Sequence, residues 1–149
     1  MSKWRHLFVD GEFIARSRLL SGLTLAQATA RPPGAPHSIY DELWHATQWQ
    51  SAVVRRDAAA AAMCETEGQQ FPSAAPENEN LWNELVAAFL EGAEQAVAWG
   101  RSPEELAKEV SPGLTFADVL ESLAVHNAYH LGKVAALRQA IGAWPPETK

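Results

Sequence analysis

The sequence predicts an all-α protein folded as a four-helix bundle. Four long segments, near residues 6–20, 38–63, 80–99 and 115–141, place apolar side chains at helical spacing. Turn-forming residues separate these segments, and no stretch of useful length alternates apolar and polar residues as a half-buried strand does. Since 47% of the 149 residues are hydrophobic and 20% are charged, we expect one domain with a sizeable core, residues 1–149. Long amphipathic helices with short connections bury their apolar faces most simply as a bundle.

The first predicted helix, residues 6–20, is expected to end at the pair Ser21-Gly22, because glycine commonly follows the last helical turn. A short helical turn is expected over residues 24–28. The sequence RPPG at residues 31–34 then breaks the chain, since proline cannot continue a helix and glycine favours a turn.

The second predicted helix extends over residues 38–63. Ser38 followed by Asp41 three residues later is typical of an N-terminal capping arrangement. Residues 65–80 are polar and contain one glycine and two prolines, which predicts a long exposed connection. Connections of this length in a compact domain are often functional or mobile.

The third predicted helix, residues 80–99, is closed by Gly100. Ser102, followed by a proline and two glutamates, predicts the start of a short helix, because a capping side chain, proline in the first turn and acidic residues suit a helix N-terminus. The fourth predicted helix, residues 115–141, begins at Thr115 as its N-cap.

The net charge of -6 and the scattered basic residues argue against nucleic acid as a partner, because binding to phosphate needs clustered Lys and Arg. No apolar run approaches the ~20 residues of a membrane span, and the N-terminal segment lacks the apolar core of a signal peptide. Cys64 is the single cysteine, so no intramolecular disulfide is expected. We expect a cytoplasmic protein that acts on a small molecule, without a membrane partner.

Three histidines within predicted helices form a candidate metal site. His126 and His130 stand four residues apart, which places both imidazoles on one face of a helix, one turn apart. His45 lies in the middle of the second predicted helix and offers a third ligand if the two helices face each other. Neutral imidazole suits Zn, Ni, Cu and Fe(II), and three protein ligands leave positions for water or substrate, as in catalytic sites.

Of two other interpretations of these histidines, a metal-free bundle remains open and a di-iron site is rejected. A histidine pair at this spacing is by itself a weak signal, and a metal-free bundle could bury the histidines hydrogen-bonded to one another. Glu42 and His45 form the Glu-x-x-His pair of di-iron bundles, but those bundles need a second such pair. No glutamate stands three residues before His126 or His130, so we reject a di-iron site.

The motifs SIYDELWHATQW, at residues 38–49, and HNAYHLGKVAALRQAIGAW, at residues 126–144, resemble the DinB-like superfamily of metal-binding four-helix bundles. The RPPG turn and the closing G-x-W-P sequence are also similar to that family. The resemblance implies an up-down-down-up bundle, often dimeric, with His45, His126 and His130 as ligands of Zn, Ni, Fe or Mn. Some relatives are transferases or isomerases that use a low-molecular-weight thiol, such as bacillithiol or mycothiol.

We therefore expect a metal-dependent enzyme that activates such a thiol, or water, for transfer to a small electrophilic substrate. Asp41 or Glu42 is expected to orient His45 or to act as a general base, and Tyr129 or Lys133 to contact the substrate. Lys133 departs from the resemblance, because glutamine is usual at that position. The alternative is a non-catalytic metal-binding or stress-linked protein, acting as a homodimer.

Overall fold

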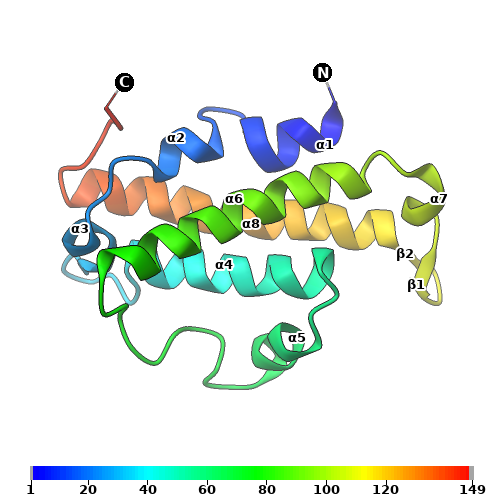
Figure 1. Ribbon diagram of the computed structural model, residues 1–149, viewed down its shortest axis with the longest axis horizontal. Helices are drawn as coiled ribbons and strands as arrows, with labels where there is room; N and C mark the ends of the chain where they lie inside the picture. Colours follow the sequence, from blue (N-terminus) through cyan, green and yellow to red (C-terminus); the bar gives the residue numbers. More distant parts are fainter. Residues whose placement is uncertain (1, 148–149) are drawn as a thin grey trace.

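The structure is a computed structural model that describes residues 2–147, and it is mostly helical, which confirms the predicted all-α class (Figure 1). Two short strands form the small antiparallel ribbon β1–β2. The elements in chain order are α1 (Lys3–Arg5), the π-helical turn η1 (His6–Asp10), α2 (Arg16–Leu20), α3 (Leu25–Thr29), α4 (Ile39–Val54), α5 (Ala58–Glu65), α6 (Glu79–Trp99), α7 (Pro103–Leu106), β1 (Glu109–Ser111), β2 (Leu114–Thr115) and α8 (Phe116–Ala140).

The two longest helices, α6 and α8, both pack against α4. The N-terminal segment, α1 to α2, lies across α6 and α8 and closes the arrangement on the side away from α4. In Figure 1, α4 and α6 both run from the end near α3 toward the end near α7, whereas α8 runs in the opposite direction. The histidine-bearing helices α4 and α8 are thus antiparallel neighbours.

Two clusters of buried apolar side chains hold these helices together, one near each end of the bundle. Ile39, Leu43 and Trp82 are fully buried in one cluster, and Phe8 and Leu120 in the other. Each such side chain stabilises the fold by ~1.5–3 kcal/mol relative to leaving it in water. The clusters fix the spacing between α4 and α8, on which the position of the histidines depends.

A buried polar contact joins the three long helices next to the histidines. The Gln50 side chain on α4 donates to the carbonyl oxygen of Phe89 on α6 at 2.8 Å and accepts from the Asn127 amide on α8 at 3.0 Å. Gly92 leaves room for this amide, because a Cβ atom there would lie 2.3 Å from Gln50 Nε2. The contact therefore fixes the register of α4 against α8, one residue from His126.

Helix starts follow the predicted capping chemistry. The Ser38 hydroxyl accepts from the backbone N–H of Asp41 at 3.1 Å, and Asp41 accepts from the N–H of Ser38 at 2.9 Å. Thr115 forms the same reciprocal box with Asp118 at the start of α8. The Ser102 cap with proline in the first turn starts α7, as predicted. Such a cap contributes ~1 kcal/mol to helix stability.

Two predictions of a continuous helix are wrong, because each of these segments is broken in the structure. The helix predicted over residues 6–20 ends at Gly11, where φ is +69°, and restarts at α2. The helix predicted over residues 38–63 breaks after α4, because Arg56 adopts a positive φ of 52° and Asp57 caps the new helix α5. A residue with positive φ cannot continue a right-handed helix, so both segments turn there.

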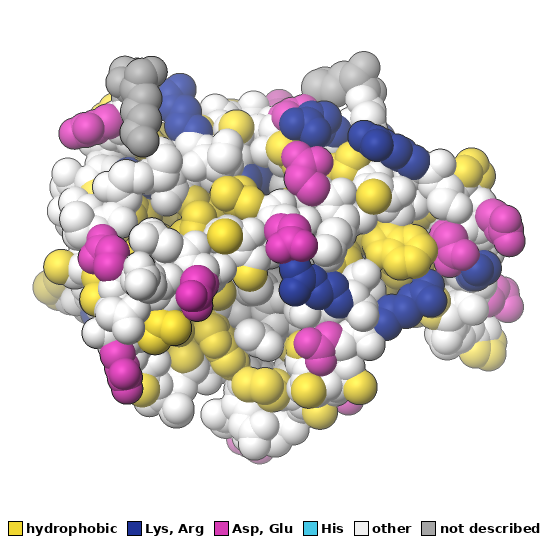
Figure 2. Space-filling model, viewed as in Figure 1, with side chains coloured by type: hydrophobic (Ala, Val, Ile, Leu, Met, Phe, Trp, Pro, Cys, Tyr) yellow, Lys and Arg dark blue, Asp and Glu magenta, His cyan; other side chains and the backbone are white. Residues whose placement is uncertain are grey.

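The ribbon at residues 109–115 was not predicted either. Its strands are too short to show an alternating pattern, and they turn at Gly113, where φ is +74°. No helix in the described part of the chain is both long enough and apolar enough to cross a membrane. On the face shown in Figure 2, basic and acidic side chains are interspersed and no histidine is visible. The histidine cluster therefore does not open onto this face.

Candidate metal centre

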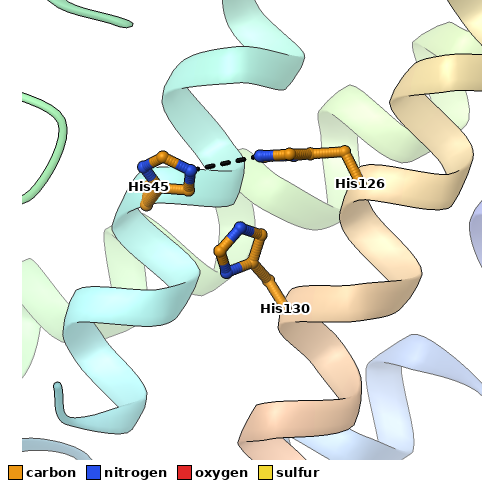
Figure 3. Close-up of side chains that lie close together, drawn as sticks. All are labelled: His45, His126 and His130. Atoms are coloured by element: carbon orange, nitrogen blue, oxygen red, sulfur yellow. Dashed lines mark hydrogen bonds between the residues drawn. The ribbon is translucent and has the colours of Figure 1, made fainter. Parts of the chain in front are cut away.

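His45 from α4 and His126 and His130 from α8 converge between the two helices (Figure 3). One ring nitrogen from each histidine lies within 4.8 Å of the others, and the Nε2 atoms of His45 and His126 are 3.1 Å apart. The predicted convergence of these three side chains is confirmed. It arises because α8 presents positions one turn apart to the middle of α4.

His130 is held by a carboxylate. Its Nδ1 atom lies 2.5 Å from Glu42 Oε2, and both side chains are buried. Burial opposes ionisation of Glu42, but the hydrogen bond from His130 and the charge of Lys133 outweigh it and lower the pKa of Glu42. An ionised Glu42 only accepts, so His130 carries its proton on Nδ1. The Nε2 lone pair of His130 is then free to face the cluster.

His45 is held by the backbone of the connection between α5 and α6. Its Nδ1 atom lies 2.7 Å from the carbonyl oxygen of Gln70, which can only accept, so Nδ1 donates and Nε2 keeps its lone pair. The ring of Phe71 stacks on His45 with a centroid distance of 4.6 Å, and the ring of His37 covers the other face of Phe71 at 3.7 Å. Residues 70 and 71 thus cover the cluster on the His45 side.

His126 differs from the other two histidines because, within the described residues, its outer nitrogen makes no hydrogen bond of normal length and angle. This nitrogen, the Nδ1 atom of His126, is buried. Burial, together with the nearby rings of His130 and His45, lowers the pKa of His126 to about 4. Burial also lowers the pKa of His45. Both imidazoles are therefore neutral near pH 7, the form that binds a metal ion.

The four other predicted site residues lie at different distances from the histidines. Glu42 contacts His130 rather than His45, and Asp41 caps α4 and pairs with Arg31 at 2.9 Å. Lys133 lies 3.4 Å from Glu42 Oε1 and over the ring of Tyr129.

The ring of Tyr129 is largely exposed and packs edge-on against His130. Gln70 and Phe71 were not singled out from the sequence. Phe71 is nevertheless the single aromatic residue between residues 65 and 80, which is the one signal the sequence offered there.

Three imidazoles on facing helices define a helical protein with a candidate mononuclear metal centre. The sequence model of the DinB superfamily matches residues 15–134, which include all three histidines, Glu42 and Lys133. The chain therefore belongs to the DinB superfamily. No curated protein and no solved structure shows a significant similarity to it.

Proposed function

We propose that this chain binds one divalent metal ion through His45, His126 and His130 and uses it to activate a low-molecular-weight thiol or water for transfer to a small electrophile. The observation that carries the proposal is the convergence of three ring nitrogens within 4.8 Å, two of them oriented by a hydrogen bond on the opposite nitrogen. Ligating histidines in metalloproteins typically have such an outer partner. Zn, Ni, Fe and Mn are the candidate ions.

The residues fit a single ion in both chemistry and size. Two nitrogens bound to one zinc ion lie at most ~4.2 Å apart, since Zn–N bonds are about 2.0–2.1 Å. A cluster within 4.8 Å thus needs only small side-chain shifts to close. The His45 to His126 contact of 3.1 Å already matches that spacing. Three protein ligands leave room for a small molecule, whereas structural zinc sites are closed by four.

A divalent ion bound here would supply a Lewis acid that lowers the pKa of a thiol or of water. Glu42 keeps the proton of His130 on Nδ1 and balances charge at the buried centre. Lys133 stabilises the Glu42 carboxylate from the solvent side. The largely exposed Tyr129 stands beside His130 and is the side chain that we propose contacts the substrate.

We also propose the up-down-down-up arrangement for the bundle and a second copy of the chain as its partner. The helix directions in Figure 1 support the arrangement. Val125 is a largely exposed apolar side chain on α8, of the kind that a contact between two copies would cover. Sedimentation velocity of the purified protein is expected to give the mass of a dimer, and a monomer at micromolar concentration would refute it.

Metal content measured by mass spectrometry on untagged, chelator-free protein tests the proposed centre. Wild type is expected to hold about one ion per chain, and His130→Ala much less. His6→Ala is the matched control, because His6 pairs with Glu12 at 3.1 Å and belongs to no cluster of ligands within residues 2–147. A wild-type protein that takes up none of Zn, Ni, Mn or anaerobic Fe(II) would exclude the proposed function.

The alternative function, a metal-binding protein without catalysis, uses the same centre. Assays of thiol consumption in the presence of an electrophile, with metal-loaded wild type and His130→Ala, separate the two. Metal-dependent turnover supports the enzyme, and stoichiometric metal without turnover of any thiol or of water supports the alternative. In a metal-free bundle the His45 to His126 contact of 3.1 Å is a plain N–H···N hydrogen bond.

A further inference from the structure

Among the described residues, one cavity borders His126 and another borders Glu42, and the two differ in which of the clustered histidines they reach. One, of about 280 Å³, lies between α4 and α8 and has His126 in its wall. The other, of about 320 Å³, is bordered by His37, Glu42 and Lys133 and reaches none of the three clustered histidines. A small molecule in the first cavity therefore touches a predicted ligand, and one in the second does not.

The cavity beside His126, hereafter the α4–α8 groove, is mainly apolar. Its wall consists of Trp49, Val53, Leu114, Asp118, Val119, Ser122, Leu123 and His126. The Trp49 ring stands edge-on to the His126 ring at 5.7 Å, so an apolar surface leads directly to the imidazole. The groove is at the small end of ligand-binding pockets, which span ~300–1,000 Å³, so it suits a compact group.

The rest of the cluster is closed. Phe71 covers His45, and His130 is only 5% exposed, with Glu42 against its outer nitrogen. His126 alone borders the groove and has an outer nitrogen without a protein partner within residues 2–147. A buried polar atom without a partner costs free energy that a bound molecule or water can recover. The groove is therefore an apolar side from which a small molecule can approach His126.

We propose that the α4–α8 groove binds the apolar part of the substrate, a compact uncharged aryl or branched-alkyl group, and presents its reactive end beside His126. This inference rests on the proposed function for the identity of the reacting centre. The binding of the apolar group itself rests on the groove alone. Water against an apolar wall makes few hydrogen bonds, so its replacement by an apolar group is favourable.

Zinc-loaded protein can be titrated calorimetrically with two metal-binding probes, benzohydroxamate and acetohydroxamate, which share a metal-binding group and differ in the aryl group. We expect benzohydroxamate to bind at least ten-fold more tightly. Val119→Trp, which fills the groove, is expected to abolish that preference while metal content and acetohydroxamate affinity remain unchanged. Ala136→Trp, in the wall of the opposite cavity, is the matched control and should retain the preference. Equal affinities of wild type for both probes would overturn the proposal.

A second measurement separates failure of the groove from failure of the metal centre. If wild type takes up no metal, the proposed function fails, and benzyl alcohol is titrated into the protein while methyl NMR signals are followed. Shifts at Val53 and Leu123 in wild type that are absent when Val119→Trp is titrated would support the groove. Absence of these shifts, or shifts only around Ala136, would overturn it.

Discussion

The two ends of the histidine cluster are built differently, although both histidines stand on the same helix. His130 is held through its Nδ1 atom by the buried Glu42 carboxylate, which also lies 3.4 Å from the partly exposed Lys133. One turn earlier, His126 borders an apolar groove and its outer nitrogen has no partner in the described part of the protein. A carboxylate partner orients a ligand and strengthens its basicity, whereas an unpartnered ligand can adjust its position.

The difference indicates that His126 and His130 have different roles within one centre. In the proposed metal centre, the His130 end would supply affinity and a fixed geometry, and the His126 end would supply access. A site fixed on all sides would leave little room for a ligand to enter, and a site fixed on none would bind metal weakly. The four predictions below test this contrast.

Replacing Glu42 should produce the largest effect. Glu42→Gln keeps the size of the side chain but removes the charge that holds the proton on His130, so metal affinity should fall by ~10–100-fold. Ser122→Ala, in the groove wall next to His126, is the matched change at the other end and should alter affinity by less than about three-fold, since it removes no outer partner. Competition with a chromophoric chelator measures both, and equal losses would contradict the contrast.

Acid should act on the metal-free protein through His126. Its pKa in the folded protein, about 4, is below the unfolded value, so between about pH 6.5 and 4 the unfolded chain binds more protons. The stability present at neutral pH is therefore lost as the pH falls through this window, by at most ~1.4 kcal/mol per pH unit for this one proton. Urea unfolding at stepped pH should show a shallower dependence for His126→Gln, and parallel curves would contradict the prediction.

Removing Phe71 should have an intermediate effect. Phe71→Ala deletes the ring stacked between His37 and His45, and we expect several-fold faster release of metal to a chelator and a loss of ~1 kcal/mol in stability. Phe13→Ala is the control, because the Phe13 side chain is 97% exposed and should change neither quantity. Unchanged release from Phe71→Ala would show that this residue does not cover the centre.

Lys133→Gln should have the smallest effect. The Lys133 to Glu42 distance is 3.4 Å and about a third of the lysine side chain is exposed, so solvent screens the pair. We expect a change in stability of less than ~1 kcal/mol and a change in metal affinity of less than about three-fold. A ten-fold change in either direction would mean that the charge of Lys133 acts directly on the centre.

Helical spacing was sufficient to predict α6 and α8 to within a residue or two, because each has a capping side chain at its start and no internal break. It was insufficient at Gly11 and Arg56. The apolar pattern continues across both positions, and only a positive φ, which spacing does not encode, ends the helix there.

Part of the candidate site can likewise be predicted from the sequence, and part cannot. The pairing of His126 with His130 follows from one helix, and their approach to His45 follows from packing two apolar faces. The contact between Glu42 and His130 depends on the register of α4 against α8, which the buried Gln50 to Asn127 bond helps to set. No sequence pattern reports that register, so the sequence predicts Asp41 or Glu42 beside His45 or as a general base, and not Glu42 beside His130.

The partner of His45 is the main-chain oxygen of Gln70, and this has a consequence for how the centre can vary. Every amino acid offers the same carbonyl, so residue 70 can be substituted without removing that acceptor. An insertion or deletion in the connection would move the oxygen even if each remaining residue were kept. The orientation of His45 thus depends on the length and path of the connection between α5 and α6. Tolerance to mutation in this connection should therefore depend on the number of its residues rather than on their identity.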